Sequence, residues 1–407
     1  MKVVRIIGRM NGGGPARQVA YLHQALRPAF DTVLVVGRIE EGEQEMRYLL
    51  NDTAAVVEVP SMSRSIRGFS ELVSLVRIAR VLRREKPDIV HTHTAKAGVL
   101  GRIAAILSGV PIRVHTYHGH IFHGYFGPTA TRLILAVERS LNRCTTRVIA
   151  ISPAQARDLT DRFHVASREQ ISVVRTGLDL PALTDADMCR TAARQRLGVS
   201  NDQRLVVWAG RLVSIKDIPL LLQIVRLARR TPRLRFLVAG EGPLWPMVAE
   251  AAKECENLQL LKWQIDMKPI LAAADLVLLT SRNEGTPAFL IEAMAVGKPF
   301  VATAVGGVVD LAVPPVEQAS NGCRRAANGF LTPADPEIML QCVELLAAAP
   351  ELAASMGEAG RVLAFANHHQ QRLADEITTL YRELLAGCAV PDRAGSLATL
   401  PEETSGQ

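Results

Sequence analysis

Short apolar runs alternate with amphipathic segments along most of the chain. The first half holds six such runs, at 2–8, 31–39, 54–59, 87–93, 112–119 and 147–152, and the second half holds five, at 204–210, 234–240, 258–263, 275–281 and 299–305. Runs of this kind are typical of strands buried on both faces, and most are separated by segments with helical periodicity. The alternation predicts α/β domains built on doubly wound parallel sheets.

The strand pattern restarts after Leu180, which predicts two domains of the same class. We expect an N-terminal Rossmann-like domain at 1–180, a C-terminal one at 181–367 and a terminal helix at 368–387. The tail at 388–407 is rich in Pro, Gly, Ser and acidic residues and is predicted to be disordered. Two such domains would face each other across a cleft at the carboxyl ends of their strands.

Composition narrows the class of protein. With 48% hydrophobic and 21% charged residues, the 407-residue chain is an ordinary globular protein. Its net charge of +7 is uneven, because residues 1–180 hold 25 Lys and Arg against 15 Asp and Glu, and the rest hold 22 against 25. A basic first half indicates an anionic substrate or surface. Only 4% of the residues are aromatic and no base-stacking motif occurs, which argues against nucleic acid.

The cysteines and the apolar stretches suggest a cytoplasmic location. Six cysteines lack metal-ligand spacing, as expected for reduced thiols. No apolar stretch reaches membrane-spanning length, and no signal-peptide pattern precedes the first strand.

Peripheral contact with an anionic membrane is nevertheless predicted for the first domain. The helical segment 69–86 should pack an apolar stripe against the core while presenting a basic face, and the loop 120–127 adds aromatic side chains that could meet a lipid chain. The stripe comprises Leu72, Val73, Val76, Ile78, Ala79 and Leu82; the basic face comprises Arg77, Arg80, Arg83, Arg84 and Lys86; and the loop contributes Phe122, Tyr125 and Phe126.

The segment 281–299, SRNEGTPAFLIEAMAVGKP, places two glutamates around a helix start. Glu284 follows the apolar run at 275–281. Thr286 is the predicted N-cap and Pro287 the first helical residue. Glu292 would lie about 7.5 Å farther along the helix axis at 1.5 Å per residue. Free amides at the helix start suit a phosphate, which the carboxylates would repel. The two acids are therefore expected to bind hydroxyl groups on either side of a diphosphate, as in a nucleotide-sugar, unless they are simply solvated.

Two other loops in the second half follow predicted strands. The segment 209–217, AGRLVSIKD, offers Arg211 and Lys216 as a cationic clamp for a diphosphate. The turn at 239–246, AGEGPLWP, has glycines that allow close approach of a ligand. Each loop alone is compatible with an ordinary surface turn, but three at one sheet edge favour a binding site.

The sequence resembles the retaining, GT-B-fold glycosyltransferases of family 4, also called group 1. The resemblance is carried by AGRLVSIKD, VAGEGPL and AAADLVLLTSRNEGTPAFLIEAMAVGKPFVATAVGGVVDL in the second half, and by PDIVHTHTAKAGVLGRIAA and HTYHGH in the first. It covers about residues 1–386. In such enzymes the second domain holds the nucleotide-sugar and the first binds the acceptor.

The resemblance implies roles for individual residues. Glu284 would bind hydroxyls of the transferred sugar, Glu292 the ribose, and Arg211 with Lys216 the diphosphate leaving group. His118 would lie against the sugar at the reaction centre, and it joins Glu284, Arg211 and Lys216 as the expected catalytic group. The remaining residues expected around the nucleotide-sugar are Gly13, Gly14, Gly210, Glu241, Gly242, Trp263, Gly285, Thr286, Pro287, Ala288 and Phe289.

The resemblance also implies a reaction. A sugar would pass from a nucleotide-sugar, with UDP as the expected nucleotide, to a glycan or polyprenyl-linked acceptor in cell-surface polysaccharide synthesis, such as that of lipopolysaccharide. No clear carboxylate nucleophile emerges. The resemblance implies front-face transfer with retention of configuration, in which the departing diphosphate would be stabilised electrostatically. No DxD-type motif stands on a loop of the nucleotide-sugar site, so neither a metal nor another cofactor is expected. Asp217 departs from the family pattern, which usually has Gly there.

Three alternatives remain open. A nucleotide-sugar 2-epimerase shares this fold and needs no acceptor. An NAD-dependent oxidoreductase would use GGGPAR as its phosphate loop, although Arg17 replaces the third glycine of that motif. The third is a non-enzymatic binding protein. His91 and His93 share one face of a predicted strand and could hold a metal, but a structural or cleft-lining role is favoured; local structural roles are expected for His115, His120 and His123.

Overall fold

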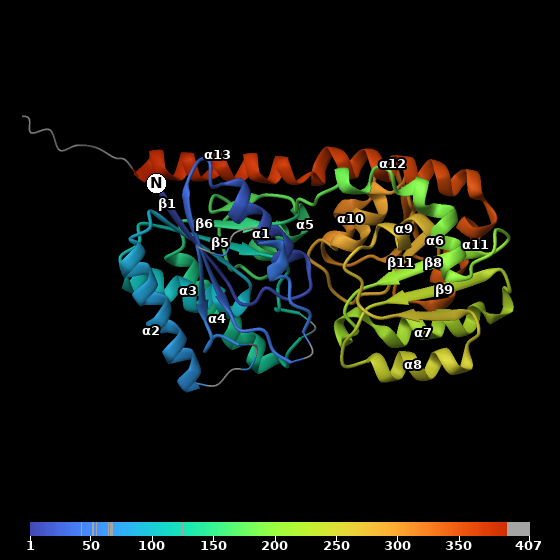
Figure 1. The fold of residues 1–407 in the computed structure, drawn as a ribbon, viewed down its shortest axis with the longest axis horizontal. Coiled ribbons are helices and arrows are strands. Elements are labelled where there is room, and N and C mark those ends of the chain that lie inside the picture. The colour runs from blue at the N-terminus through green and yellow to red at the C-terminus, as the bar shows by residue number, and fades with distance from the viewer. Residues whose placement is uncertain are drawn as a thin grey trace, which may run out of the picture.

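The computed structural model describes residues 1–41, 43–50, 53, 55–63, 65, 68–123 and 125–388, and it consists of two α/β domains side by side (Figure 1). The predicted pair of doubly wound sheets is confirmed. Nearly all of the predicted disordered tail, from residue 389 on, lies outside the described residues. In the loop 120–127, Tyr125 and Phe126 are exposed as predicted, but Phe122 is buried at 4% exposure, which corrects the expectation that it could meet a lipid chain.

The first sheet has seven strands, all paired in parallel. In spatial order they are β3 (Val56–Val59), β2 (Asp31–Gly37), β1 (Lys2–Ile7), β4 (Ile89–His93), β5 (Ile112–Tyr117), β6 (Arg147–Ala150) and β7 (Ile171–Val173). Six were predicted. The edge strand β7 was missed because it is only three residues long and none of its residues is buried.

The second sheet has eight strands and is mixed, which corrects the expectation of a purely parallel sheet. In spatial order they are β10 (Leu258–Leu261), β9 (Leu234–Ala239), β8 (Arg204–Ala209), β11 (Leu276–Leu279), β12 (Phe300–Thr303), β15 (Gly329–Thr332), β14 (Arg324–Ala326) and β13 (Val316–Gln318). The antiparallel pairs β13–β14 and β14–β15 form one edge. The outermost strand, β13, is wholly exposed, so apolar periodicity could not reveal it.

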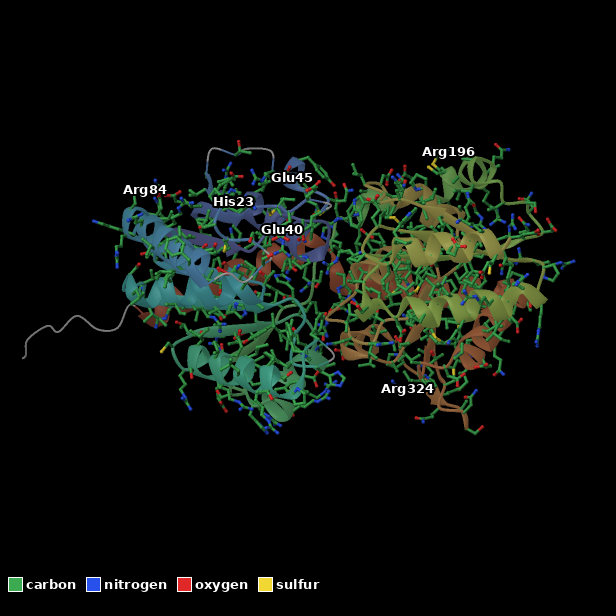
Figure 2. All side chains as sticks on the ribbon, turned by 90° about the horizontal axis from the view of Figure 1, so that it is seen from below. His23, Glu40, Glu45, Arg84, Arg196 and Arg324 are labelled. Atoms are coloured by element: carbon green, nitrogen blue, oxygen red, sulfur yellow. The ribbon has the colours of Figure 1, made fainter. Side chains whose placement is uncertain are left out.

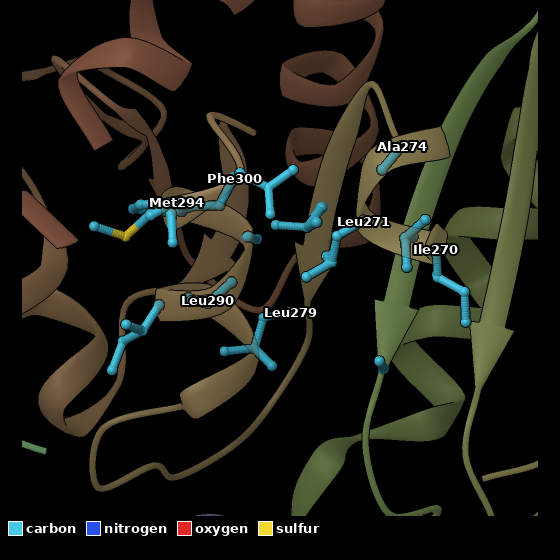
Figure 3. Packing of buried hydrophobic residues seen from close by; sticks show 14 of the residues in the cluster. Ile270, Leu271, Ala274, Leu279, Leu290, Met294 and Phe300 are labelled. Atoms are coloured by element: carbon cyan, nitrogen blue, oxygen red, sulfur yellow. The ribbon is translucent and has the colours of Figure 1, made fainter. Parts of the chain in front are cut away.

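Helices cover both faces of each sheet. In the first domain, α2 (Gly68–Glu85), α3 (Ala95–Leu107) and α4 (Pro128–Arg143) form one layer, while α1 (Gly14–Ala25) packs on the other face; the short α5 (Pro153–Arg157) follows β6. In the second domain, one face carries α6 (Arg190–Leu197), α9 (Lys268–Ala273), α10 (Ala288–Ala295) and α12 (Pro350–His368), and the other carries α7 (Ile218–Leu227), α8 (Trp245–Glu254) and α11 (Pro336–Ala348). Figure 3 shows part of the core between the second sheet and the helix layer that contains α10. There, Leu279 and Phe300 of the sheet pack near Leu290 and Met294 of α10.

The chain crosses between the domains twice, and the last helix, α13 (Gln370–Cys388), returns to the first domain (Figure 1). The two crossings are hydrogen-bonded to each other, because the amide of Leu178 donates to the carbonyl of His368 (2.8 Å) and the amide of Gln370 donates to the carbonyl of Leu178 (3.0 Å). Leu373, Ile377 and Tyr381 of α13 are buried against the first sheet. The terminal helix therefore completes the core of the first domain.

The helix α2 differs from its prediction on one face. Ile78, Ala79 and Leu82 are buried as expected, but Leu72 and Val76, which were assigned to the core stripe, are 56% and 39% exposed. The predicted stripe is therefore wider than the set of α2 residues that the core buries.

No single helix in the described part of the chain is long and apolar enough to cross a membrane, although the bent pair α11 and α12 together satisfies the length and composition of a span.

Candidate active site

A cavity of about 280 Å³ lies between the domains, at the carboxyl ends of their parallel strands. The first domain contributes the loops after β1 and β5. The second contributes the loops after β8, β10 and β11, together with the start of α10. This is the position in which open α/β sheets bind ligands, because loops from several strands converge there.

Most of the predicted site residues line this cavity. They are Gly13, Gly14, His118, Gly210, Arg211, Lys216, Trp263, Glu284, Gly285, Thr286, Pro287, Ala288, Phe289 and Glu292. Glu241 and Gly242 do not line it. The Glu241 side chain instead accepts a hydrogen bond from Nε2 of Gln44, across the cleft, at 2.8 Å.

The start of α10 corrects one local prediction. The helix begins at Ala288, with Pro287 at the N-cap position and no capping side chain. Thr286 was the predicted N-cap, but its hydroxyl donates to the carbonyl of Ile151 in the first domain at 3.4 Å. The Thr286 side chain thus contacts the first domain instead of capping the helix, and the residues around it in the sequence could not reveal this contact. The first-turn amides of Ala288 and Phe289 have no intrahelical partner and lie at the cavity.

Glu284 is held by two groups of its own domain. It forms an ion pair with Nζ of Lys216 and accepts a hydrogen bond from Oγ of Ser281 at 2.5 Å. The loop that carries Lys216 is fixed in turn, because Oγ1 of Thr280 donates to the Lys216 carbonyl at 2.8 Å. The side chain of Arg211 is exposed, and Arg211 takes part in none of the ion pairs found among the described residues. Of the two predicted diphosphate-binding cations, Lys216 is therefore already paired with a carboxylate, whereas Arg211 is exposed.

Glu292 is paired across the cleft. Its Oε1 contacts Nη1 of Arg17, which lies near the start of α1 in the first domain. Burial raises the pKa of Glu292, and the charge and hydrogen bond of Arg17 act in the opposite direction. The carboxylate predicted to bind a ribose is therefore occupied by a guanidinium group.

The half-buried His118 is the first of a chain of side chains that runs into the core of the first domain. Its Nε2 lies 3.0 Å from Nδ1 of His93. The centroid of the His93 ring lies 4.1 Å from that of His91, with the ring planes tilted by 33°. His91 in turn contacts the Tyr381 hydroxyl at 2.6 Å and Oγ1 of Thr116 at 2.7 Å. Desolvation lowers the pKa of His118 to about 4, so the ring is neutral at pH 7.

These contacts agree with the structural role favoured for His91 and His93, and neither residue is among those that line the cavity. His115 also has a local partner, since its Nδ1 lies 2.8 Å from Oγ1 of Thr92. Among the residues that the structure describes, no group of three or more His, Cys, Asp or Glu is arranged to hold a metal ion.

Two glycines allow the domains to approach closely. A Cβ atom on Gly285 would lie 2.7 Å from the carbonyl oxygen of His118 and 3.0 Å from the amide of Gly119. A Cβ atom on Gly12 would lie 2.9 Å from the ring of Trp263. Both contacts join loops of different domains, so larger side chains would widen the cleft.

Asp217, the departure from the family pattern, has a positive φ of 47° and sits between Lys216 and α7. A positive φ is costly for a residue with a Cβ atom, which explains why glycine suits this position. Here the Asp217 carboxylate receives a bidentate contact from Arg282, at 2.7 and 3.0 Å. This pair ties the Lys216 loop to the Glu284 loop and offsets part of the strain.

The prediction missed several residues that line the cavity, namely Pro15, Arg17, Gly119, His120, Tyr125, Gln264, Met267 and Asn283. Arg17 was noticed only as a residue that replaces a glycine, and its partner is 275 residues away. His120, expected to be local structure, does have a local partner in Asp158 at 3.0 Å, but it also reaches the cavity. The spacing of residues along the sequence could not reveal that these distant loops meet at one cavity.

Two Rossmann-like domains that face a shared cavity are the architecture of GT-B glycosyltransferases. The family model described as Glycosyltransferase Family 4 matches residues 12–181, and the model described as Glycosyl transferases group 1 matches residues 203–349. The chain belongs to the group 1 glycosyltransferases of family 4.

Relatives and solved structures agree with this assignment. The UDP-Gal:α-D-GlcNAc-diphosphoundecaprenol α-1,3-galactosyltransferase of Escherichia coli is 30% identical over 269 residues, covering 63% of this chain and 68% of the relative. A capsular polysaccharide biosynthesis glycosyltransferase of Staphylococcus aureus is 26% identical and covers 84% and 88%. The sucrose-phosphate synthase of Thermosynechococcus elongatus has the same fold, with a TM-score of 0.78 at 20% identity, over 95% of this chain and 100% of that structure.

Proposed function

We propose that this glycosyltransferase moves a sugar from a UDP-sugar to a glycan or polyprenyl-linked acceptor, with retention of configuration, in cell-surface polysaccharide synthesis. The single observation that carries the proposal is the cavity between the domains. It brings two acids, three cations, a helix start and two histidines to one place. The named substrates of the Escherichia coli relative, a UDP-sugar and a polyprenyl diphosphate sugar, support the choice of donor and acceptor.

The sugar donor fits the cavity by the chemistry of its parts. Glu292 would accept hydrogen bonds from the ribose, and Glu284 from the transferred sugar. The diphosphate would lie between them, against the first-turn amides of α10 and beside Arg211 and Lys216. The base would then lie toward the aromatic ring of Trp263.

The reaction would depend on the leaving group. The bond between the anomeric carbon and the diphosphate oxygen breaks, and charge builds on that oxygen. Cations and amides that are already in place stabilise this charge more than water does. The acceptor hydroxyl attacks from the same face, and its proton passes to the departing diphosphate. His118, neutral at pH 7, would contact the sugar as a hydrogen-bonding group rather than as a cation.

A lipid-linked acceptor would reach the site from a membrane at the inner face of the cell, and the α2–α3–α4 layer is the surface that favours this. Large apolar side chains are exposed along all three helices and on the loop before α4. They are Phe69, Leu72, Val76, Ile106, Leu107, Tyr125, Phe126, Leu133 and Val137, and we call this set the apolar face. Phe69 is 81% and Leu133 68% exposed. Tyr125 belongs both to this face and to the cavity, so a lipid on the face would lead to the site.

The charges beside the apolar face have one sign. The acidic side chains of α2 and α4 are half-buried, as are Glu71 and Glu85, or buried, as is Glu138. The exposed charges of the two helices are the arginines Arg77, Arg80, Arg83, Arg84, Arg132, Arg139 and Arg143. Figure 2 shows Arg84 at the outer end of α2. The acid of α4, Glu138, is buried in an ion pair with Arg102 at 2.6 Å. Apolar and basic side chains together suit an anionic lipid surface.

Two experiments test the proposed reaction. In a thermal-shift screen with UDP, GDP, ADP and their sugars, a ligand at 100 times its Kd should stabilise the fold by about 2.7 kcal/mol. We expect UDP and UDP-sugars to give the shift. The anomeric configuration of the product, read by NMR, then tests retention. An inverted product would refute the mechanism, and no shift with any nucleotide would refute the donor site.

Incubation with the sugar donor alone separates transfer from the epimerase alternative. An epimerase would convert the nucleotide-sugar into its epimer without an acceptor, whereas a transferase leaves its configuration unchanged. A transfer assay with sugar donor and acceptor, repeated after treatment with EDTA, tests the proposal that no metal is needed, because transfer should then be unaffected.

A further inference from the structure

The ion pair between Arg17 and Glu292 joins the two domains inside the candidate site. Arg17 lies on α1, three residues after Gly14, and Glu292 lies on α10. Their side chains are 27% and 13% exposed, and both residues line the cavity. In contrast, the Gln44–Glu241 contact crosses the same cleft outside the cavity and is exposed.

The pair and the proposed ribose contact need the same oxygen atoms. Arg17 engages Oε1 of Glu292. Two neighbouring ribose hydroxyls would each donate to this carboxylate, so one of them competes directly with the guanidinium. A charge displaced from such a partly buried partner is unfavourable unless it finds another partner.

The nearest new partner would be the sugar donor itself. The Gly12–Gly13–Gly14 turn and Arg17 lie on one side of the cavity, and Lys216 and the α10 amides lie on the other. A diphosphate bound to the amides would carry negative charge into this space. Arginine binds phosphate oxygens well, because its planar group can make two parallel hydrogen bonds.

We propose that Arg17 exchanges partners when the sugar donor binds: it pairs with Glu292 in the free enzyme, gives the carboxylate up to the ribose, and pairs instead with the diphosphate. This inference rests on the proposed nucleotide-sugar site. Arg17 would then be a residue of the first domain that binds the sugar donor, and the exchange would draw that domain onto the ligand only after a nucleotide with phosphates has arrived.

The exchange predicts opposite effects on two ligands of one variant. Arg17→Gln removes the competitor of the ribose, so a nucleoside without phosphates, such as uridine, should bind several-fold more tightly than to the wild type. The same substitution removes a charge-assisted contact to phosphate, so UDP should bind about tenfold more weakly. Binding is measured by NMR titration for uridine and by calorimetry for UDP. If GDP or ADP gives the largest thermal shift in the nucleotide screen, the corresponding nucleoside and nucleoside diphosphate are used in place of uridine and UDP.

Two further variants keep the test decisive. Gln44→Ala breaks a contact across the cleft that lies outside the cavity, and it should leave both affinities within about twofold. Arg17→Lys keeps a charge without the planar fork and should shift both affinities in the same directions as Arg17→Gln, but less; it carries the test if Arg17→Gln does not fold.

The outcomes separate this inference from the proposed function. If the wild type binds UDP but Arg17→Gln weakens uridine and UDP alike, the arginine only supports the site and the exchange is refuted. The exchange is also refuted if neither affinity changes. If the wild type binds none of UDP, GDP and ADP, the nucleotide-sugar site itself is wrong, and the exchange fails with it.

Discussion

Nδ1 of His93 lies 3.0 Å from Nε2 of His118, so the histidine at the cavity is oriented by one that is completely buried. His93 in turn packs against the tilted ring of His91, whose ring nitrogens contact Thr116 and Tyr381. Tyr381 lies on α13, the helix that returns from the second domain. The orientation of His118 therefore depends on the docking of the terminal helix.

We predict that the fold loses stability as the pH falls from about 6.5 to 4. Desolvation lowers the pKa of His118 and of His368 to about 4, and it places the pKa values of His91, His93 and His115 well below the usual 6.5. In this window the unfolded chain binds protons that the folded chain does not, so unfolding is favoured by about 1.4 kcal/mol per pH unit for each such group.

Thermal unfolding between pH 7.5 and 4.5 measures the effect. The variant His368→Asn should show a weaker dependence of Tm on pH, and the exposed His123→Gln should behave like the wild type. A Tm that stays constant down to pH 4.5 would contradict the prediction.

The features that could be predicted from the sequence are those set by residues close together in the chain, namely buried strands and the loops that follow them. Both sheets follow from apolar runs such as 275–281, whose side chains are buried whichever helix covers them. The loop residues Glu284 and Lys216 were found because a strand ends just before each loop. Partners from distant segments could not be found: Arg17 meets Glu292, and Thr286 turns to Ile151, only because the two domains pack together. Short exposed strands such as β13 escaped because burial gives them no pattern.

Glu292→Ala should weaken the binding of the sugar donor. The ribose hydroxyls lose a charged acceptor, which typically contributes about 1.5–3 kcal/mol. Glu284→Ala should instead lower kcat and change the choice of sugar, since this residue would contact the transferred group. Calorimetry with UDP and with the UDP-sugar distinguishes the two. Glu250→Ala, an exposed site on α8, is the control, and unchanged affinity and rate in both test variants would contradict the assignment.

Arg211→Ala and Lys216→Ala should each reduce kcat strongly, by about 100-fold, as expected for loss of a group that stabilises the leaving group. Their effects on stability should differ. Arg211 is exposed, so its loss should leave Tm unchanged, whereas the loss of Lys216 leaves Glu284 with Ser281 as its remaining partner and should lower Tm. Wild-type turnover at saturating sugar donor in either variant would show that the residue does not act on the diphosphate.

Gly285→Ala should impair turnover through geometry alone. The new methyl group would meet backbone atoms of His118 and Gly119, which cannot rotate away, so the domains must separate slightly there. Displacements of about 1 Å near a reacting group can cost about 100-fold in rate. We expect a lower kcat with nucleotide affinity largely kept, since most of the proposed nucleotide contacts lie in the second domain. Gly68→Ala, which meets open space, should be neutral, and a fully active Gly285→Ala would show that this contact does not matter.

The protein should bind anionic vesicles through its first domain, and high salt should reverse the binding. Each arginine near an anionic surface contributes about 1 kcal/mol, and salt screens this attraction. Arg132→Gln combined with Arg143→Gln on α4 should therefore weaken co-sedimentation about 30-fold at low salt. The same pair of changes at Arg229 and Arg230, exposed residues of the second domain, controls for net charge.

The apolar face makes a separate contribution that salt does not screen. Phe126→Ser with Leu133→Ser should reduce binding at every salt concentration, whereas Leu345→Ser with Val362→Ser, exposed on the second domain, should not. If the first domain delivers a lipid-linked acceptor, both sets of variants should also lose activity on an acceptor embedded in vesicles while keeping it on a short soluble analogue. Equal binding of the wild type to neutral and anionic vesicles, or binding to neither, would remove the membrane from the proposal. A soluble acceptor would then account better for the basic surface.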